Sequence, residues 1–261
     1  MRKDNKTAET KRRQKMEGTK EKKTRWLHVL IALLLSAGAV SGSLFLYKQW
    51  NKAKDLAEEY TFEYNEVAKI GDEKITMEEF MLYSVDTTNS YESTYGEDIW
   101  SESTINENGE QETYENIVKK DIFEQIRMVK AFCKEADTLG ISISEDELKM
   151  VNNNADSYYE DLAKAGATEN EDLTKQVVRS FYRESYLAQR VYAYYMEMYP
   201  TEEDSKQEYS DEFLKKVAEV TEKHYPDFNY DYDINWELMD YLNFNVSGET
   251  DGNAEESGEL E

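Results

Sequence analysis

Few side chains in this sequence could do chemistry, and the first of them is a single cysteine. A nucleophilic thiol needs a base such as histidine beside it. The sequence has two histidines, His28 within an uncharged run and His224 far from Cys133 along the chain. Cys133 also falls on the apolar stripe of an expected helix, where a small side chain fits a core. We therefore interpret Cys133 as a core residue rather than as a nucleophile.

The second group is a histidine followed by a row of aspartates: His224, Asp227, Asp231 and Asp233. Their spacing superficially resembles a calcium-binding loop, but the glycine at the sixth position and the closing glutamate are absent. Strand-like alternation explains the pattern without a metal. The sequence also has no Ser-His-Asp set, phosphate-binding glycine loop, HExxH motif or paired cysteines. We expect no catalytic residue, no metal and no cofactor.

One uncharged run, Trp26–Tyr47, indicates where the chain is located. It has 22 residues, and a helix of that length spans about 33 Å, enough to cross a bilayer core of about 30 Å. Residues 1–25 hold 11 Lys and Arg against 4 Asp and Glu, which predicts a basic cytoplasmic arm and an extracellular C-terminal part. An alternative is a signal peptide cleaved after Ala39, since residues 37–39 read Ala-Gly-Ala.

The composition limits the function of the remaining part. The formal net charge of the whole chain is −25, which argues against nucleic acid as a partner. A single cysteine excludes an intramolecular disulfide, so packing must hold the fold. We expect a charged helical stalk over residues 48–65, one helical domain over 66–244, and an acidic disordered tail over 245–261.

The domain is expected to be mainly α. A strand, a turn and a second short strand are predicted within Val67–Ile75, and Thr76 begins a helix that fades near Asn89. Residues 96–112 are expected to be a polar loop. Further helices are predicted over Tyr114–Leu139, from Ser144 to about Lys164, over Glu171–Tyr199 and over Thr201–Lys223. Alternating aromatic and acidic residues predict a strand over Asp227–Glu237.

Two segments resemble the SurA/PrsA-type extracytoplasmic chaperones. VAKIGDEKITMEEF is similar to the opening of that domain, and KEADTLGISISEDEL to the later junction of two helices. DINWELMDYLNF is similar to its final strand and Trp-containing turn. The resemblance implies a small two-stranded antiparallel sheet that pairs the N- and C-terminal strands. It further implies a protein that binds unfolded or exported polypeptides without catalysis.

The chain departs from many such proteins in lacking a parvulin-type prolyl isomerase module. The 26 residues between Pro200 and Asp227 are too few for that module, and the sequence has no Gly-Gly pair. Isomerase activity is therefore not expected. Two rival functions remain open, a scaffold subunit of a cell-envelope complex and a degenerate prolyl isomerase, and the oligomeric state is undetermined.

The candidate binding surface lies on the helix predicted over 171–199, because apolar residues cover more than half of its circumference. Methionine and tyrosine suit adaptable contacts with varied partners. The alternative is that this extra apolar face packs inside the domain. The predicted client-binding residues are Tyr182, Tyr186, Tyr192, Met196 and Tyr199.

Overall fold

A computed structural model describes residues 65–106, 109–169, 172–201 and 209–244. The basic arm, the Trp26–Tyr47 run, the stalk up to residue 64 and the tail from residue 245 lie outside these residues. No helix within the described residues is long and apolar enough to cross a membrane. Because the Trp26–Tyr47 run lies outside the described residues, this structure does not test the predicted membrane anchor.

The described chain is mainly helical. Its helices are α3 (Met77–Tyr95), α4 (Tyr114–Leu139), α5 (Glu145–Lys164), α6 (Lys175–Met198), α7 (Asp211–His224) and the short α8 (Trp236–Met239), with 3-10 helices η2 (Glu97–Ser101) and η3 (Ala167–Glu169). Its strands are β1 (Glu66–Ile70), β2 (Glu73–Thr76), β3 (Ser103–Ile105) and β4 (Gln111–Thr113).

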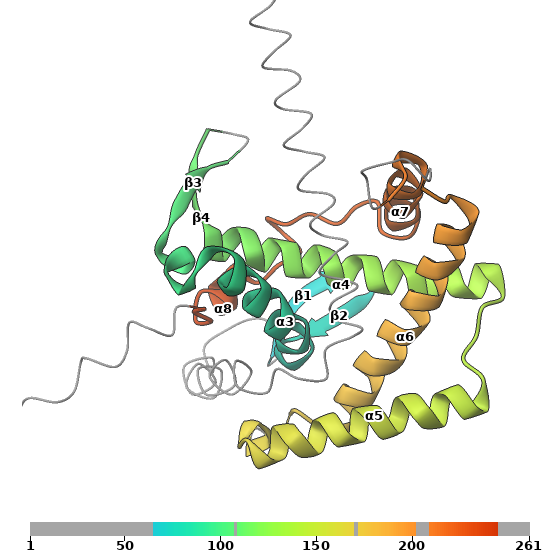
Figure 1. Cartoon of the computed structure of the whole chain (residues 1–261). Helices are drawn as coiled ribbons and strands as arrows, with labels where there is room; N and C mark the ends of the chain where they lie inside the picture. The colour runs from blue at the N-terminus through green and yellow to red at the C-terminus, as the bar shows by residue number, and fades with distance from the viewer. Residues whose placement is uncertain (1–64, 107–108, 170–171, 202–208, 245–261) are drawn as a thin grey trace, which may run out of the picture.

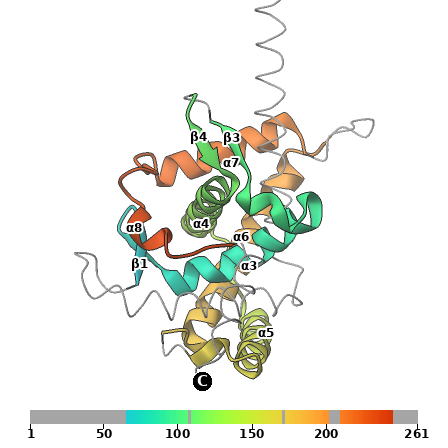
Figure 2. The same ribbon diagram turned by 90° about the vertical axis from the view of Figure 1, so that its left-hand side faces the viewer.

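Helix α4 is the centre of the molecule. It contacts α3, α6 and α7 (Figure 1), and a view nearly along its axis shows the other elements arranged around it (Figure 2). Its apolar stripe, predicted from the sequence, is buried at Val118, Ile122, Ile126 and Val129. Helix α6 crosses α4 and also contacts α5, which lies on the outer side of α6.

The helix ends follow the signals in the sequence. Thr76 accepts a hydrogen bond from the Glu79 N–H at the start of α3. Ser144 begins α5 as predicted and forms a capping box with Glu147. Gly140 ends α4 in a left-handed conformation with φ of 69°, which costs glycine little. Helix α3, however, continues to Tyr95 rather than fading near Asn89.

The predicted hairpin within Val67–Ile75 is confirmed, because β1 and β2 pair antiparallel around Gly71. The predicted pairing of the N-terminal strand with a C-terminal strand is wrong beyond one residue pair. Ala68 and Ile234 form an isolated antiparallel bridge. The bridge is flanked by bonds from the Lys69 N–H to the Asp233 carbonyl (2.8 Å) and from the Asn235 N–H to the Val67 carbonyl (2.9 Å).

The strand predicted over Asp227–Glu237 is also wrong. The Asn229 side chain accepts a hydrogen bond from the Asp231 N–H, and the Asp233 carboxylate accepts one from the Asn229 N–H. These local bonds favour turns over a strand. Asn235 then caps α8, with its side chain accepting from the Leu238 N–H.

The polar loop predicted over 96–112 contains η2 and the β3–β4 hairpin instead. Trp100 of η2 is buried, with its ring 5.2 Å from that of Phe244, and its indole N–H donates to Glu92. The sequence of the loop is polar, but two of its three apolar residues, Ile99 and Trp100, are buried. Contact with the distant Phe244 therefore orders a segment that local polarity predicts as irregular.

A buried cation fixes the C-terminal segment to α4. Lys119 is 1% exposed, and its ammonium donates to the carbonyls of Met239 (2.8 Å) and Leu242 and to the Glu115 carboxylate (2.6 Å). Burial lowers the pKa of Lys119, and the Glu115 charge opposes that shift. The three oxygens satisfy the three protons of the ammonium group.

Candidate functional site

The candidate site lies on α6, whose position depends on its two ends. Thr174 caps the start of the helix by accepting a bond from the Val177 N–H, and Pro200 follows its end, where it cannot continue the helical hydrogen bonding. One face of α6 is buried in the core through Val178, Phe181, Ala188, Val191 and Tyr195.

Two of the predicted binding residues, Tyr182 and Tyr186, are half-buried. The Tyr182 ring centroid is 5.8 Å from that of Tyr158 on α5, and the Tyr186 hydroxyl donates to Glu147 over 3.0 Å. This side of α6 therefore packs against α5 and contributes to the helical hairpin.

Tyr192 and Tyr199 face other neighbours. Tyr192 is 8% exposed, and its ring lies edge-on to Phe213 of α7 at 4.8 Å. Tyr199 stacks on Tyr195 at 6.4 Å, and its carbonyl accepts a bond from the Ser210 hydroxyl. The five predicted residues therefore do not form one surface, and Met196 is the one among them that is exposed.

The last two turns of α6 hold more exposed apolar surface than the sequence predicts. Tyr194, Met196 and Met198 are 38%, 39% and 49% exposed, and we call these three residues the α6 tip. Tyr194 and Met198 are four residues apart and share one side of the helix, whereas Met196 faces another. Tyr194 and Met198 are not among the predicted binding residues.

The α6 tip is held close to a buried carboxylate on α4. Glu135 is 4% exposed. Its oxygens accept bonds from Tyr195 of α6 (2.7 Å) and from Lys223 (2.6 Å) and His224 (2.8 Å) of α7. Burial raises the pKa of Glu135, but these hydrogen bonds and the Lys223 charge oppose burial and lower the pKa to about 2. Glu135 therefore joins α4, α6 and α7 while it carries a charge.

A second polar group holds the middle of α6. Lys130 of α4 lies 2.7 Å from Glu184 of α6 and 2.8 Å from Glu79 of α3. Burial lowers the pKa of Lys130, but the two carboxylates outweigh burial and raise it overall. One side of α6 is thereby tied to the core by charge as well as by apolar contact.

Cys133 lies beside this group, with its Sγ 3.5 Å from the Glu184 carbonyl oxygen. Burial, followed by the Glu184 charge, raises the pKa of the Cys133 thiol to about 12. Because the thiolate is the reactive form, this environment makes Cys133 a poor nucleophile at neutral pH.

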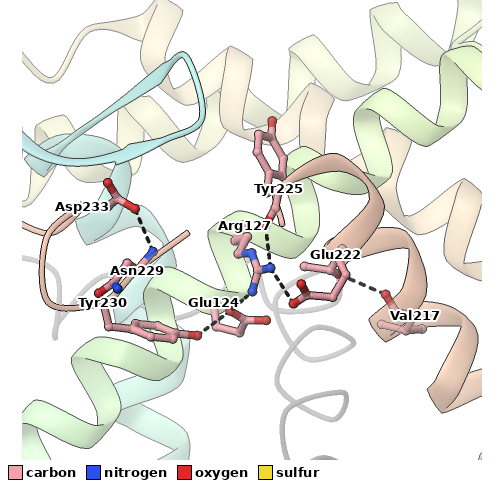
Figure 3. Close-up of polar contacts among 9 residues, drawn as sticks. Glu124, Arg127, Val217, Glu222, Tyr225, Asn229, Tyr230 and Asp233 are labelled. Carbon is pink, nitrogen blue, oxygen red and sulfur yellow. Dashed lines mark hydrogen bonds and ion pairs between the residues drawn. The ribbon is translucent and has the colours of Figure 1, made fainter. Parts of the chain in front are cut away.

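A third polar group surrounds Arg127 of α4 (Figure 3). Arg127 of α4 donates to Glu222 (2.7 Å), to Glu124 (3.0 Å) and to the Tyr225 carbonyl (2.6 Å), and the Tyr230 hydroxyl also bonds Glu124. Asp233 bonds the Asn229 N–H (Figure 3), whereas His224 bonds Glu135. No three or more His, Cys, Asp or Glu side chains gather as a metal site within the described residues.

Comparison with known proteins gives no relative from which a function could be transferred: no family model, no curated protein and no solved structure matches this chain.

Proposed function

We propose that this chain is a membrane-anchored extracytoplasmic protein that binds unfolded or exported polypeptides without catalysis, like the SurA/PrsA-type chaperones but without their isomerase module. The α6 tip is the binding segment, and it presents apolar groups on two sides of the helix, Tyr194 and Met198 on one and Met196 on the other. The supporting observation is that three of the seven exposed large apolar side chains of the described residues lie within Tyr194–Met198. The helix that carries them is tied to α4 and α7 through Glu135, so these exposed side chains project from a fixed support.

The residue types in the tip suit weak and varied partners. Methionine has three rotatable bonds and a polarizable sulfur, so it adapts to apolar groups of different shape. Fully burying one such side chain contributes about 1.5–3 kcal/mol, and most of that gain is offset by the entropy lost on association. A contact of this size is reversible, as a protein that releases its clients requires.

The membrane part of the proposal rests on the uncharged Trp26–Tyr47 run and on the basic residues that precede it. An uncleaved helix there keeps the domain at the outer membrane face, where exported chains emerge. The proposal assigns no catalytic residue.

The test is suppression of aggregation by the full-length chain in detergent, measured by light scattering of a chemically denatured client protein. We expect the wild-type chain to suppress aggregation at stoichiometric concentration. The double substitution Met196→Gln and Met198→Gln should reduce the suppression severalfold, because it replaces apolar groups by polar ones of similar length. Met150→Gln is the matched control, since Met150 is 47% exposed on α5, away from the tip.

Four outcomes would overturn the proposal or a part of it. If the wild-type chain does not suppress aggregation, the chaperone function is refuted. If Met150→Gln reduces the suppression as much as the double substitution does, the assignment of client binding to the α6 tip is refuted. Capture of one stoichiometric envelope protein, with no effect on denatured clients, would favour a scaffold subunit instead. A prolyl isomerase would accelerate cis-trans exchange in a proline peptide, and we expect no acceleration.

A further inference from the structure

The β3–β4 hairpin has an unpaired outer edge. The Asn106 N–H bonds the Glu110 carbonyl (2.8 Å) and the Tyr114 N–H bonds the Glu102 carbonyl (3.0 Å). In an antiparallel pair, bonded and non-bonded residue pairs alternate. The Ser103–Thr113 and Ile105–Gln111 pairs are therefore non-bonded pairs, and the backbone N–H and C=O groups of Ser103 and Ile105 point away from β4.

This edge is accessible. Ser103 and Ile105 are exposed, and the Ile105 side chain is 65% exposed. The hairpin projects away from the helices (Figure 1). Within the described residues, no backbone hydrogen bond from another element reaches the outward groups of Ser103 and Ile105. An edge of this kind is a template for an added strand.

The hairpin and the sequence that flanks it carry only acidic charges. The sequence from Ile75 to Val118 contains eleven Asp and Glu and no Lys or Arg. Glu112 pairs with Lys120 of α4 over 2.6 Å. Glu97, Asp98, Glu102 and Glu110, which precede β3 and β4 in the sequence, are exposed, and within the described residues none of them forms an ion pair with Lys, Arg or His.

We propose that the β3 edge is a second binding surface, which accepts an extended, lysine- or arginine-rich segment of a partner polypeptide as a third strand. The outward N–H and C=O groups of Ser103 and Ile105 pair with the backbone of that segment. Basic side chains of the segment lie near Glu97, Glu102 and Glu110, and an apolar side chain covers Ile105.

This surface is distinct from the α6 tip, and the proposal does not depend on the chaperone function. Backbone pairing provides contact without regard to sequence, whereas the acidic surround selects basic segments over acidic ones. Because the ionic part of the contact is exposed, binding should weaken as salt is added.

The probe is a short fluorescent peptide of alternating lysine and valine, added to the full-length chain in detergent and followed by anisotropy. A peptide of alternating glutamate and valine tests charge. A lysine-valine peptide that is N-methylated at every second residue tests backbone pairing, because it keeps the charge and loses the donors on one edge. We expect the N-methylated peptide to bind about tenfold more weakly or worse, and the glutamate peptide not to bind.

Substitutions assign the site. The double substitution Glu97→Gln and Glu102→Gln should lower the affinity for the lysine-valine peptide about three- to tenfold at low salt. Glu145→Gln with Glu160→Gln, which removes the same charge from exposed positions on α5, should change the affinity less than twofold.

Equal binding of the methylated and unmethylated peptides would overturn the strand-addition proposal, and so would equal weakening by both pairs of substitutions. The double methionine substitution of the α6 tip should leave this binding unchanged. If the wild-type chain suppresses aggregation but does not bind the lysine-valine peptide, this inference is refuted and the proposed function stands.

Discussion

The substitution Glu135→Gln tests how the α6 tip is held. Glu135 accepts hydrogen bonds from Tyr195, Lys223 and His224 at 2.6–2.8 Å. The substitution keeps the size and one acceptor oxygen of the side chain and removes its charge. It therefore probes the charge-assisted part of the three contacts rather than the packing of the residue.

The magnitude follows from the pKa of this carboxyl group. Its pKa falls from an ordinary value of 4.5 to about 2 in the folded chain. At about 1.4 kcal/mol for each tenfold change in proton affinity, folding gains about 3 kcal/mol from the ionised group. Because the folded pKa is depressed, this contribution is complete above about pH 4.5 and is lost as the pH falls toward 2.

The assay is urea unfolding of the full-length chain in detergent, followed by far-ultraviolet circular dichroism at several pH values. Glu135→Gln should lower the free energy of unfolding by about 2–3 kcal/mol at pH 7, and the difference from wild type should shrink as the pH falls below about 4.5. The control is Glu219→Gln, which removes an exposed pair with Lys215 on α7 and should cost less than about 1 kcal/mol. A difference that does not change with pH, or a loss no larger than that of the control, would refute the reasoning.

Three further predictions follow from single features. Gly71 and Gly140 both have positive φ, +63° and +69°, but a Cβ at Gly71 would lie 3.1 Å from the Tyr225 ring, whereas one at Gly140 meets nothing within 4 Å. Gly140→Ala should therefore lower the free energy of unfolding in urea by about 1 kcal/mol, and Gly71→Ala should lower it by more. Equal losses would exclude the contact with Tyr225. Burial raises the pKa of the Cys133 thiol to about 12, so iodoacetamide should label it at least tenfold more slowly at pH 8 in the folded chain than in urea, and equal rates would contradict that environment. If Trp26–Tyr47 is an uncleaved anchor, the mature chain should stay in the membrane pellet after alkaline carbonate extraction, while release with an N-terminus at residue 40 would establish cleavage.

The elements that the sequence predicted well are those whose signals are local. Tyr114–Leu139 has one apolar stripe between a capping threonine and Gly140, and the structure gives α4 with the same bounds. The Ser144–Glu147 capping box and the Gly71 turn depend on neighbouring residues in the same way. Each of these signals involves residues within a few positions of one another, so no knowledge of the tertiary fold was required.

The errors arose where distant residues decide the conformation. Phe228 and Tyr230 alternate with acidic residues as in a strand, but Arg127 lies over the Phe228 ring and Glu124 accepts the Tyr230 hydroxyl. Both partners come from α4, about a hundred residues earlier in the chain. Phe228 and Tyr230 therefore face a helix rather than a neighbouring strand. Tyr232, the next aromatic residue of the alternation, is 83% exposed.

The candidate site depends on distant residues in the same way. Helical spacing indicated that α6 has more apolar surface than one face can bury, and of the five predicted binding residues Met196 is the exposed one. Whether each tyrosine is covered depends on α5 and α7, which pack against α6 from elsewhere in the sequence. Phe213 of α7 covers Tyr192, and Tyr158 of α5 lies against Tyr182.

The most direct test of the central claim is site-specific photo-crosslinking from the α6 tip. A photoreactive amino acid replaces Met198 in one full-length chain and Met150 in another, since both methionines are exposed to a similar extent, 49% and 47%. The chains are irradiated in detergent with a denatured client protein and with the same client folded. The account predicts crosslinks to the denatured client from position 198, few from position 150, and few to the folded client from either. Equal crosslinking from both positions, or none from position 198, would contradict it.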